Sequence, residues 1–349
     1  MLETGLGNPR RIAVFRALQL GDLLCAVPAL RALRRAHPEA HMTLIGLPWA
    51  ASFATRFAHL VDGFIPFPGF PGLPERVPDI AAFPTFVTAA QAARFDAALQ
   101  LHGRGDLTNP IVALLGARVT AGFRGEGQWC SDPALHATWP AAGHEINRLL
   151  VLMDHLGIPR AGLGLEFPLA PDELAAASAL RQRHGLDAGR YACVHPGARL
   201  HSRRWPPESF ASVARTLSQA GLRVVVTGGA EEADLTARVA ALVPGALDLA
   251  GATSLGVLGA LLQDARVLVC NDTGVSHVAA ALGTRSVVVS CGADPWRFAP
   301  LDEERHEVLH EAIACRPCAY DLCPIGHPCA HALTPERVAP RVVARIGVD

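Results

Sequence analysis

The sequence of 349 residues contains no lysine, so all 31 of its basic residues are arginine. A contact that other proteins make with a lysine ammonium must therefore be made here by a guanidinium, which is planar and donates its hydrogen bonds in a fork. Acidic residues number 32, and the formal net charge is −1. This balance excludes the broad basic field of a nucleic-acid-binding protein, and we expect no nucleic-acid partner.

The sequence also has no long apolar run, and we expect no secretory leader. No stretch comes near the roughly 18 uninterrupted apolar residues of a transmembrane helix. The opening residues, MLETGLGNPRR, lack the apolar core of a signal peptide. Half of the residues are hydrophobic and 18% are charged, which is typical of a folded soluble protein. We therefore expect a cytoplasmic protein, in which the nine cysteines do not form a disulfide framework.

Short apolar runs alternate with helical patterns in both halves of the chain. Predicted strands lie at 11–15, 41–48, 95–103, 191–194, 222–227, 267–270 and 286–289. This alternation is typical of doubly wound parallel sheets. A segment rich in proline and glycine, 159–173, is the predicted linker. The sequence thus predicts an α/β protein with two Rossmann-like domains that face a central cleft, one over 1–165 and one over 166–349.

Small and polar residues follow several predicted strands of the second half. One strand runs into Asn271–Gly274 and another into Gly228 and Gly229. A helix start carries unpaired N–H groups and partial positive charge, and small residues let a phosphate reach them. The carboxylates of Glu231 and Glu232 are suited to accept hydrogen bonds from ribose hydroxyls. We interpret this set as a nucleotide site, and the alternative is that the polar residues only cap helices.

Further charged residues complete the predicted chemistry. Arg199, Arg203 and Arg204 precede a helix and can neutralise a diphosphate leaving group, although a solvated basic loop is the alternative. In the first half, Asp22 follows Gly21 at a helix start. There it either caps the helix or acts as a general base on an acceptor hydroxyl. Two such motif sets on two domains favour group transfer between two bound substrates.

Four stretches, in this order, resemble the family 9 glycosyltransferases, the ADP-heptose-dependent heptosyltransferases of lipopolysaccharide assembly and their relatives. They are FRALQLGDLLCAVPALRALRRAHPEAHMTLIG, HPGARLHSRRWPPESFASVARTL, VVVTGGAEEADL and NDTGVSHVAAALGTRSVVV. The resemblance covers nearly the whole chain. It implies the GT-B architecture, with the acceptor on the N-terminal domain and the nucleotide-sugar on the C-terminal domain. It also implies an inverting reaction that needs neither a catalytic metal nor another catalytic cofactor.

The resemblance assigns roles to individual residues. Asp22 falls on the catalytic base, and the ribose-binding acid falls on Glu231 or Glu232. Arg16 and Arg203 fall where the family usually carries lysine, and Arg203 takes the place of the phosphate-binding lysine. The implied nucleotide-sugar-binding residues are Arg16, Gly21, His195, Arg203, Gly228, Gly229, Glu231, Glu232, Asp272, Thr273, Gly274, Ser276 and His277.

The resemblance also implies the substrates. The donor is ADP-heptose or a similar nucleotide-sugar, and the acceptor is a hydroxyl of a lipopolysaccharide core sugar. Two alternatives stay open at this point: a protein acceptor, as in relatives that modify autotransporter proteins, and a GT-B-shaped sugar-nucleotide epimerase. The expected location is cytoplasmic, with peripheral contact to the inner membrane left open.

Four cysteines crowd into residues 315–329. Their spacing, Cys315-x2-Cys318-x4-Cys323-x5-Cys329, is a pattern of metal ligands, and thiolates bind zinc or iron. Some of the relatives that modify autotransporter proteins carry a cysteine-bound iron. The sequence therefore predicts a structural zinc or iron site in this segment, with free thiols or a disulfide pair as the alternative.

Overall fold

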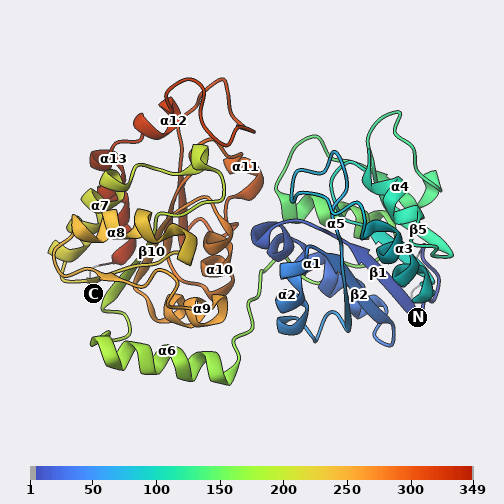
Figure 1. Ribbon diagram of the computed structural model, residues 1–349, viewed down its shortest axis with the longest axis horizontal. Coiled ribbons are helices and arrows are strands. Elements are labelled where there is room, and N and C mark those ends of the chain that lie inside the picture. The colour runs from blue at the N-terminus through green and yellow to red at the C-terminus, as the bar shows by residue number, and fades with distance from the viewer. Residues whose placement is uncertain (1–4, 348–349) are drawn as a thin grey trace. The chain divides into compact units, whose positions relative to one another are not determined.

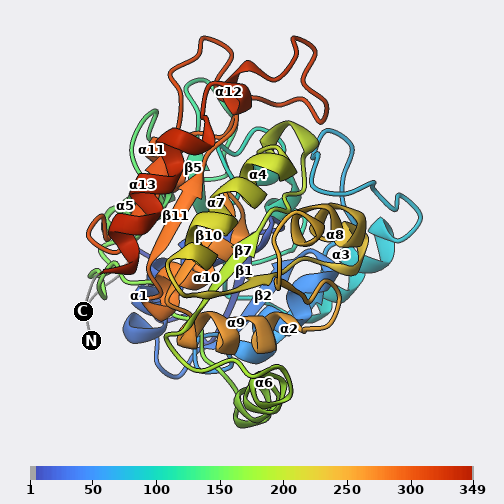
Figure 2. The same ribbon diagram turned by 90° about the vertical axis from the view of Figure 1, so that its left-hand side faces the viewer.

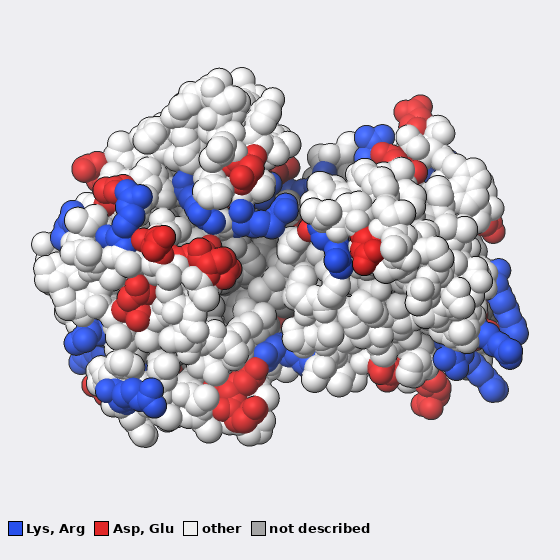
Figure 3. Space-filling model, viewed as in Figure 1, with Lys and Arg blue, Asp and Glu red and all other residues white. Residues whose placement is uncertain are grey.

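The structure is a computed structural model that describes residues 5–347. The chain divides into two compact units between Pro168 and Leu169, within the proline- and glycine-rich segment 159–173 (Figure 1). We call the N-terminal part unit 1 and the C-terminal part unit 2. Over residues 5–347, no helix is both long and apolar enough to cross a membrane. Acidic and basic side chains are interspersed on the visible face of each unit, in keeping with the net charge of −1 (Figure 3).

Unit 1 is built on a parallel sheet of six strands in the order β3-β2-β1-β4-β5-β6. Its strands are β1 (Arg11–Phe15), β2 (His41–Gly46), β3 (Gly63–Pro66), β4 (Ala97–Gln100), β5 (Val119–Arg124) and β6 (His136–Thr138). Its helices are α1 (Leu20–Ala36), α2 (Ala51–Arg56), α3 (Phe83–Ala92), α4 (Thr108–Ala113) and α5 (Glu145–His155), with short 3₁₀ turns at Pro48–Ala50 and Pro133–Leu135.

Both faces of the sheet in unit 1 are covered. On one face, Ala13 and Phe15 of β1 join a buried cluster with Phe67, Phe86 and Ile111. The alternate residues of β1 are buried as well, and α1 packs against α5. A parallel strand buried on both faces must be apolar at nearly every position, which is why the run IAVF stands out in the sequence.

Unit 2 repeats this topology with the strand order β12-β11-β10-β7-β8-β9, again all parallel. Its strands are β7 (Tyr191–His195), β8 (Arg223–Val226), β9 (Leu247–Asp248), β10 (Val267–Asn271), β11 (Ser286–Val289) and β12 (His306–Leu309). Its helices are α6 (Pro171–His184), α7 (Pro207–Gln219), α8 (Ala233–Ala241), α9 (Leu255–Asp264), α10 (Gly274–Leu282), α11 (Pro295–Phe298), α12 (Pro328–His331) and α13 (Pro335–Ile346), with 3₁₀ turns at His201–Arg203 and Ala230–Glu232.

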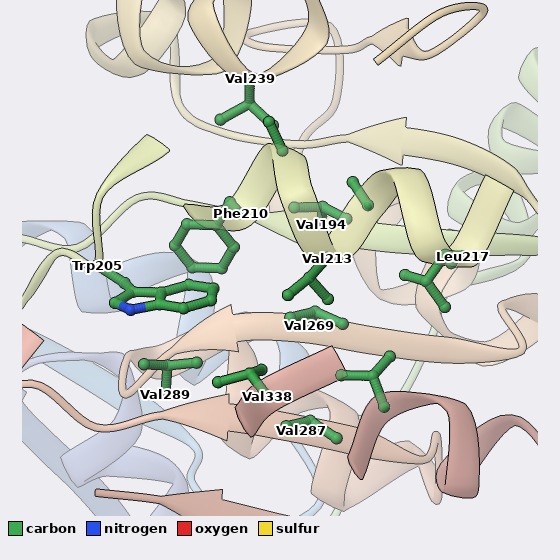
Figure 4. Packing of buried hydrophobic residues seen from close by; sticks show 14 of the residues in the cluster. Val194, Trp205, Phe210, Val213, Leu217, Val239, Val269, Val287, Val289 and Val338 are labelled. Carbon is green, nitrogen blue, oxygen red and sulfur yellow. The ribbon is translucent and has the colours of Figure 1, made fainter. Parts of the chain in front are cut away.

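The core of unit 2 lies between the sheet and the helices α7, α8 and α13 (Figures 2 and 4). Trp205 is fully buried there, edge-on to Phe210 with ring centroids 5.1 Å apart. Its indole nitrogen donates a hydrogen bond to the carbonyl of Leu333 (2.8 Å). Trp205 therefore ties the start of α7 to the chain that enters α13. The predicted α/β class with two doubly wound parallel sheets is confirmed.

Candidate functional site

The strand order of unit 2 reverses between β7 and β10, and ligands of doubly wound sheets bind at such a reversal. Asn271, the last residue of β10, is fully buried and links the two strand ends. Its side chain donates to the carbonyl of Pro196 (2.7 Å) and accepts from the backbone N–H of Trp205 (2.9 Å). The sequence predicts a small residue that leaves room for a phosphate at Asn271. The structure shows instead a buried brace that holds the loop after β7.

Helix α10 begins directly after β10, and its first turn has no side-chain cap. Thr273 is the N-cap residue but makes no side-chain cap hydrogen bond. The hydroxyl and the backbone N–H of Ser276 both donate to the carbonyl of Thr273, at 2.7 and 3.0 Å. Gly274 opens the helix without a Cβ that would obstruct a ligand. The helix-capping alternative therefore does not hold here, and the start of α10 is suited to bind an anion.

Asp272 stands between β10 and α10, and its side chain is half-buried. Oδ2 accepts a hydrogen bond from the hydroxyl of Ser290 (3.2 Å). Burial raises the pKa of the Asp272 carboxyl, while the guanidinium groups of Arg203 and Arg316 act to lower it. The Nε of Arg203 is buried and has no hydrogen-bond partner among the described residues. Asp272 and Arg203, both predicted from the sequence, are thus electrostatic neighbours in the structure.

The ends of β7 and β8 bring together His195 and the acidic pair. The imidazole Nδ1 of His195 lies 3.1 Å from the Thr227 hydroxyl, and the side chain is buried. Burial lowers the pKa of His195, with Glu232 and Glu231 opposing the shift. We therefore treat this imidazole as neutral at pH 7, which makes it a hydrogen-bonding group and not a cation for a phosphate.

The structure gives Glu231 and Glu232 different surroundings, whereas the sequence did not show which of them is the ribose-binding acid. Glu232 accepts a hydrogen bond from the N–H of Gly229 (3.0 Å) and lies 4.0 Å from a guanidinium nitrogen of Arg204, so it caps the turn behind β8. Glu231 is exposed. Close packing requires the glycine at position 228, because a Cβ there would lie 2.7 Å from the buried Thr236. A Cβ at Gly229 would meet only the flexible end of the exposed Glu231 side chain.

His277, on the inner side of α10, is buried at 4% exposure with its ring edge-on to Phe298 (6.4 Å between centroids). His277 thus packs inside unit 2, in the first turn of α10, which begins at Gly274.

The cysteine segment, residues 315–329, is tied to the turn that carries Arg203. The backbone N–H of Ser202 donates to the carbonyl of Asp321 (2.7 Å), and the imidazole Nε2 of His327 lies 2.7 Å from the carbonyl of Ser202. The N–H of Cys318 donates to the carbonyl of Gly292 (2.6 Å). The segment, drawn in red around α12, therefore braces the strand ends of unit 2 (Figure 2).

The four cysteines of this segment do not form a metal-binding group in the structure. Over residues 5–347, no three His, Cys, Asp or Glu side chains are arranged to hold a metal ion, and all nine cysteines are free thiols. The disulfide alternative is therefore wrong for the structure described. Cys315 and Cys323 lie close enough to Cys329 to raise the pKa of its thiol, after the larger effect of burial.

In unit 1, Gly21 and Asp22 lie in the first turn of α1, which begins at Leu20. The Asp22 side chain is 24% exposed and lies 3.9 Å from the guanidinium of Arg16. Arg16 follows β1 and is 1% exposed. Its Nε donates to the backbone carbonyl of Asp22 (2.8 Å) and its Nη2 to the buried carboxylate of Glu145 (3.1 Å).

The remaining terminal nitrogen of Arg16 donates to the carbonyl of Leu101. Each of its three nitrogens is thus engaged inside unit 1, which favours a role in holding Asp22 over the implied contact with the nucleotide-sugar. Glu145 was missed by the sequence reasoning. It stands 129 residues from Arg16, and no local pattern marks it.

Comparison with known proteins identifies the family. Glycosyltransferase family 9 (heptosyltransferase) matches residues 86–328. Lipopolysaccharide heptosyltransferase 1 of Escherichia coli is 23% identical over 300 residues, covering 82% of this chain and 89% of its own length. Lipopolysaccharide heptosyltransferase 2 of Salmonella typhimurium is 26% identical over 306 residues, covering 83% of this chain and 85% of its own.

Solved structures show the same fold. The family 9 glycosyltransferase of Veillonella parvula aligns with a TM-score of 0.79 at 20% identity, covering 97% of both chains. E. coli heptosyltransferase WaaC with ADP-2-deoxy-2-fluoro heptose aligns at 0.66 and 20% identity over 96% of this chain and 99% of its own. The iron-containing glycosyltransferase TibC of E. coli aligns at 0.57 and 15% identity over 97% and 76%.

These likenesses confirm the predicted GT-B fold, and the epimerase alternative falls because the family match covers well over half of the 349 residues. The chain therefore belongs to glycosyltransferase family 9, the heptosyltransferase family, and is a glycosyltransferase.

Proposed function

We propose that this enzyme transfers a heptose from ADP-heptose to a hydroxyl of a lipopolysaccharide core sugar, with inversion at the anomeric carbon and without a catalytic metal. The observation that carries the proposal is the start of α10, which has no side-chain cap and lies beside the half-buried carboxylate of Asp272 and the unpartnered Nε of Arg203. The relatives named lipopolysaccharide heptosyltransferase 1 and 2 support the donor and the acceptor class.

On the donor side, unit 2 binds the diphosphate. The free amides at the start of α10 and the guanidinium of Arg203 stabilise the negative charge that builds up on the leaving ADP. Glu231 binds the ribose hydroxyls, since it is exposed while Glu232 is committed to capping the turn and lies near Arg204. In this proposal the work that other transferases assign to a metal ion is done by amides and a guanidinium.

On the acceptor side, unit 1 supplies the base. Asp22 takes the proton of the acceptor hydroxyl as its oxygen attacks the anomeric carbon, the bond to the diphosphate breaks, and ADP leaves with the bonding electron pair. Arg16 and Glu145 hold Asp22 in place. A pocket of about 420 Å³ in unit 1, lined in part by Phe67, Arg76 and Phe86, is a candidate for acceptor contacts.

A protein acceptor is the second candidate. TibC is titled an iron-containing heptosyltransferase in one of its solved structures, and it aligns with a TM-score of 0.57. The E. coli ADP-heptose LPS heptosyltransferase II aligns more closely, with a TM-score of 0.72, which favours the lipopolysaccharide acceptor. A cytoplasmic location and peripheral contact with the inner membrane stay predictions.

A structural zinc or iron at Cys315, Cys318, Cys323 and Cys329 also stays a prediction from their spacing. The described residues hold these thiols in an arrangement that does not fit a metal ion, and no step of the reaction is assigned to one. Elemental analysis of protein purified without chelators tests whether these cysteines hold a metal. About one metal ion per chain, lost in Cys323→Ser, would support the site. Active enzyme without metal would exclude it.

The test of the proposed function is calorimetric binding of ADP, UDP and GDP to the whole enzyme, repeated with Asp272→Ala and Arg203→Ala. We expect ADP to bind more tightly than UDP and GDP, and both variants to weaken it. Transfer of labelled heptose to lipopolysaccharide core or to a protein acceptor then separates the two candidates. Equal affinity for the three nucleotides, or none, contradicts the donor assignment.

A further inference from the structure

A second pocket, of about 560 Å³, lies in unit 2 and is lined by none of the residues that the sequence assigned to the nucleotide-sugar. Asp294 and Trp296, which follow β11, form one side. Residues 312–314, Arg316 and Pro317, which follow β12 and begin the cysteine segment, form the other. Its volume lies within the range of small-molecule sites.

The strand order places this pocket on the opposite side of β10 from the ribose site. In the order β12-β11-β10-β7-β8-β9, Gly228 and Glu231 follow β8, whereas the pocket residues follow β11 and β12. The proposed diphosphate site, at the start of α10, follows the strand between them. A nucleotide-sugar carries its diphosphate between the nucleoside and the sugar. With the nucleoside directed toward β8, the sugar is directed toward β11 and this pocket.

A chain of hydrogen bonds joins the pocket wall to Asp272. One terminal nitrogen of Arg316 donates to the hydroxyl of Ser290 (3.2 Å), and that hydroxyl donates to Oδ2 of Asp272 (3.2 Å). The other terminal nitrogen of Arg316 donates to the carbonyl of Ser290 (2.7 Å). Its Nε is buried and has no partner among the described residues. Arg316 is therefore fixed in place with one donor left over.

The chemistry of the lining fits a neutral, polyhydroxylated ring. Trp296 is 67% exposed, and its edge-to-face contact with His310 (4.9 Å between centroids) leaves ring surface open for stacking. The carboxylate of Asp294 is suited to accept hydrogen bonds from hydroxyls, and the Nε of Arg316 is suited to donate one. One positive and one negative side chain balance each other, so the lining does not select for a phosphate.

We propose that this pocket holds the glycosyl group of the donor, with Trp296 stacked on the sugar ring and Asp294 and Arg316 in contact with its hydroxyls. The inference rests on the proposed function and adds the residues that recognise the sugar. It also gives the cysteine segment a role at the substrate, because Arg316 stands between Cys315 and Cys318.

Calorimetry with two ligands tests the proposal on the whole enzyme. The probes are ADP, which has no sugar beyond its ribose, and ADP-2-deoxy-2-fluoro heptose. We expect Trp296→Ala to leave the Kd of ADP within twofold and to raise the Kd of the fluoro analogue about fivefold to tenfold, the loss of one stacking contact. Asp294→Asn keeps a capping side chain at α11 and should raise the analogue Kd about threefold. Trp129→Ala, at an exposed tryptophan of unit 1, is the matched control.

Three results would overturn the proposal. A loss of ADP affinity in Trp296→Ala would mean that the ring stacks on the adenine. In steady-state kinetics of the same variants, a raised KM for the acceptor with unchanged affinity for the fluoro analogue would mean that the pocket belongs to the acceptor sugar. Unchanged affinities in both variants would mean that the pocket does not contact substrate. If wild-type enzyme does not bind ADP, the proposed function itself fails, and that failure is seen before any variant is made.

Discussion

Two arginines, one in each unit, stand where this family usually carries lysine, and they behave in opposite ways. Arg16 of unit 1 is buried and donates to Asp22, Glu145 and Leu101. Arg203 of unit 2 keeps a buried Nε without a partner among the described residues. The guanidinium of Arg16 is therefore part of the scaffold of unit 1, and we propose that the guanidinium of Arg203 binds the donor diphosphate. The residue type is the same at both positions and does not distinguish their roles. The number of guanidinium nitrogens that already have a hydrogen-bond partner does distinguish them.

The largest expected effect concerns the group that Arg16 holds. Asp22→Asn keeps the shape of the side chain and removes the base, so we expect kcat to fall roughly 10²- to 10⁴-fold while the Kd of ADP is unchanged. Steady-state kinetics and calorimetry measure the two quantities. A variant with near-normal kcat would show that Asp22 is not the general base.

Arg16→Met tests whether Arg16 stabilises the fold of unit 1. It leaves the carboxylate of Glu145 buried without its partner, and breaking a buried ion pair in this way costs about 3–5 kcal/mol of unfolding free energy. Denaturant unfolding should show that loss. The double variant Arg16→Met/Glu145→Gln, which also removes the buried charge of Glu145, should recover part of it. Loss of ADP affinity with stability unchanged would reverse the roles of the two arginines.

Arg203→Met tests whether Arg203 contributes to the binding of ADP. Because a charge-assisted hydrogen bond contributes about 1.5–3 kcal/mol, we expect the Kd of ADP to rise about 10- to 100-fold while the unfolding midpoint stays within experimental error. Arg285→Met, at an exposed arginine of unit 2 outside this loop, is the control and should bind ADP normally. Equal effects of the two substitutions would indicate a general field and not a specific contact.

Asp272, the electrostatic neighbour of Arg203, makes the stability of unit 2 depend on pH, and Asp272→Asn tests this dependence. Burial raises the pKa of Asp272 above its ordinary value of 3.8, so the folded protein holds this proton more tightly than the unfolded chain does. The contribution of the carboxyl to stability is therefore complete below about pH 4 and is lost as pH rises through the folded pKa. In thermal unfolding without ligand, the variant should match the wild type in acid and exceed it at neutral pH. A variant less stable than the wild type at pH 7 would contradict this.

The smallest effect is expected in the cysteine segment. Asp321 accepts hydrogen bonds from His201 through its side chain and from Ser202 through its carbonyl, next to Arg203. Asp321→Ala removes only the side-chain bond, so we expect the Kd of ADP to rise about threefold. Calorimetry at matched ionic strength measures this change. An unchanged Kd would mean that the turn is positioned without this bond.

The sequence predicted the βα alternation, and it predicted that the small residues after β8 and β10 lie where a strand ends and a helix begins. Both features are local in the sequence. The burial of strands on two faces imposes apolar runs, and a helix start after a strand calls for small polar residues. It could not distinguish Glu231 from Glu232, since their roles depend on which carboxylate reaches the N–H of Gly229. The brace at Asn271 was missed for the same reason, because its partners are 66 and 75 residues away.

By itself, the sequence determined the fold class and the family, which follow from periodicity and contiguous motifs. The strand ends that it assigned to the nucleotide-sugar stay a prediction. Only the tertiary structure decided how the charges are used. It paired Arg16 with Glu145, 129 residues apart, and linked Arg316 of the cysteine segment through Ser290 to Asp272. The physical reason is that the energy of a buried charge depends on the partners that folding brings to it, and a linear pattern does not contain them.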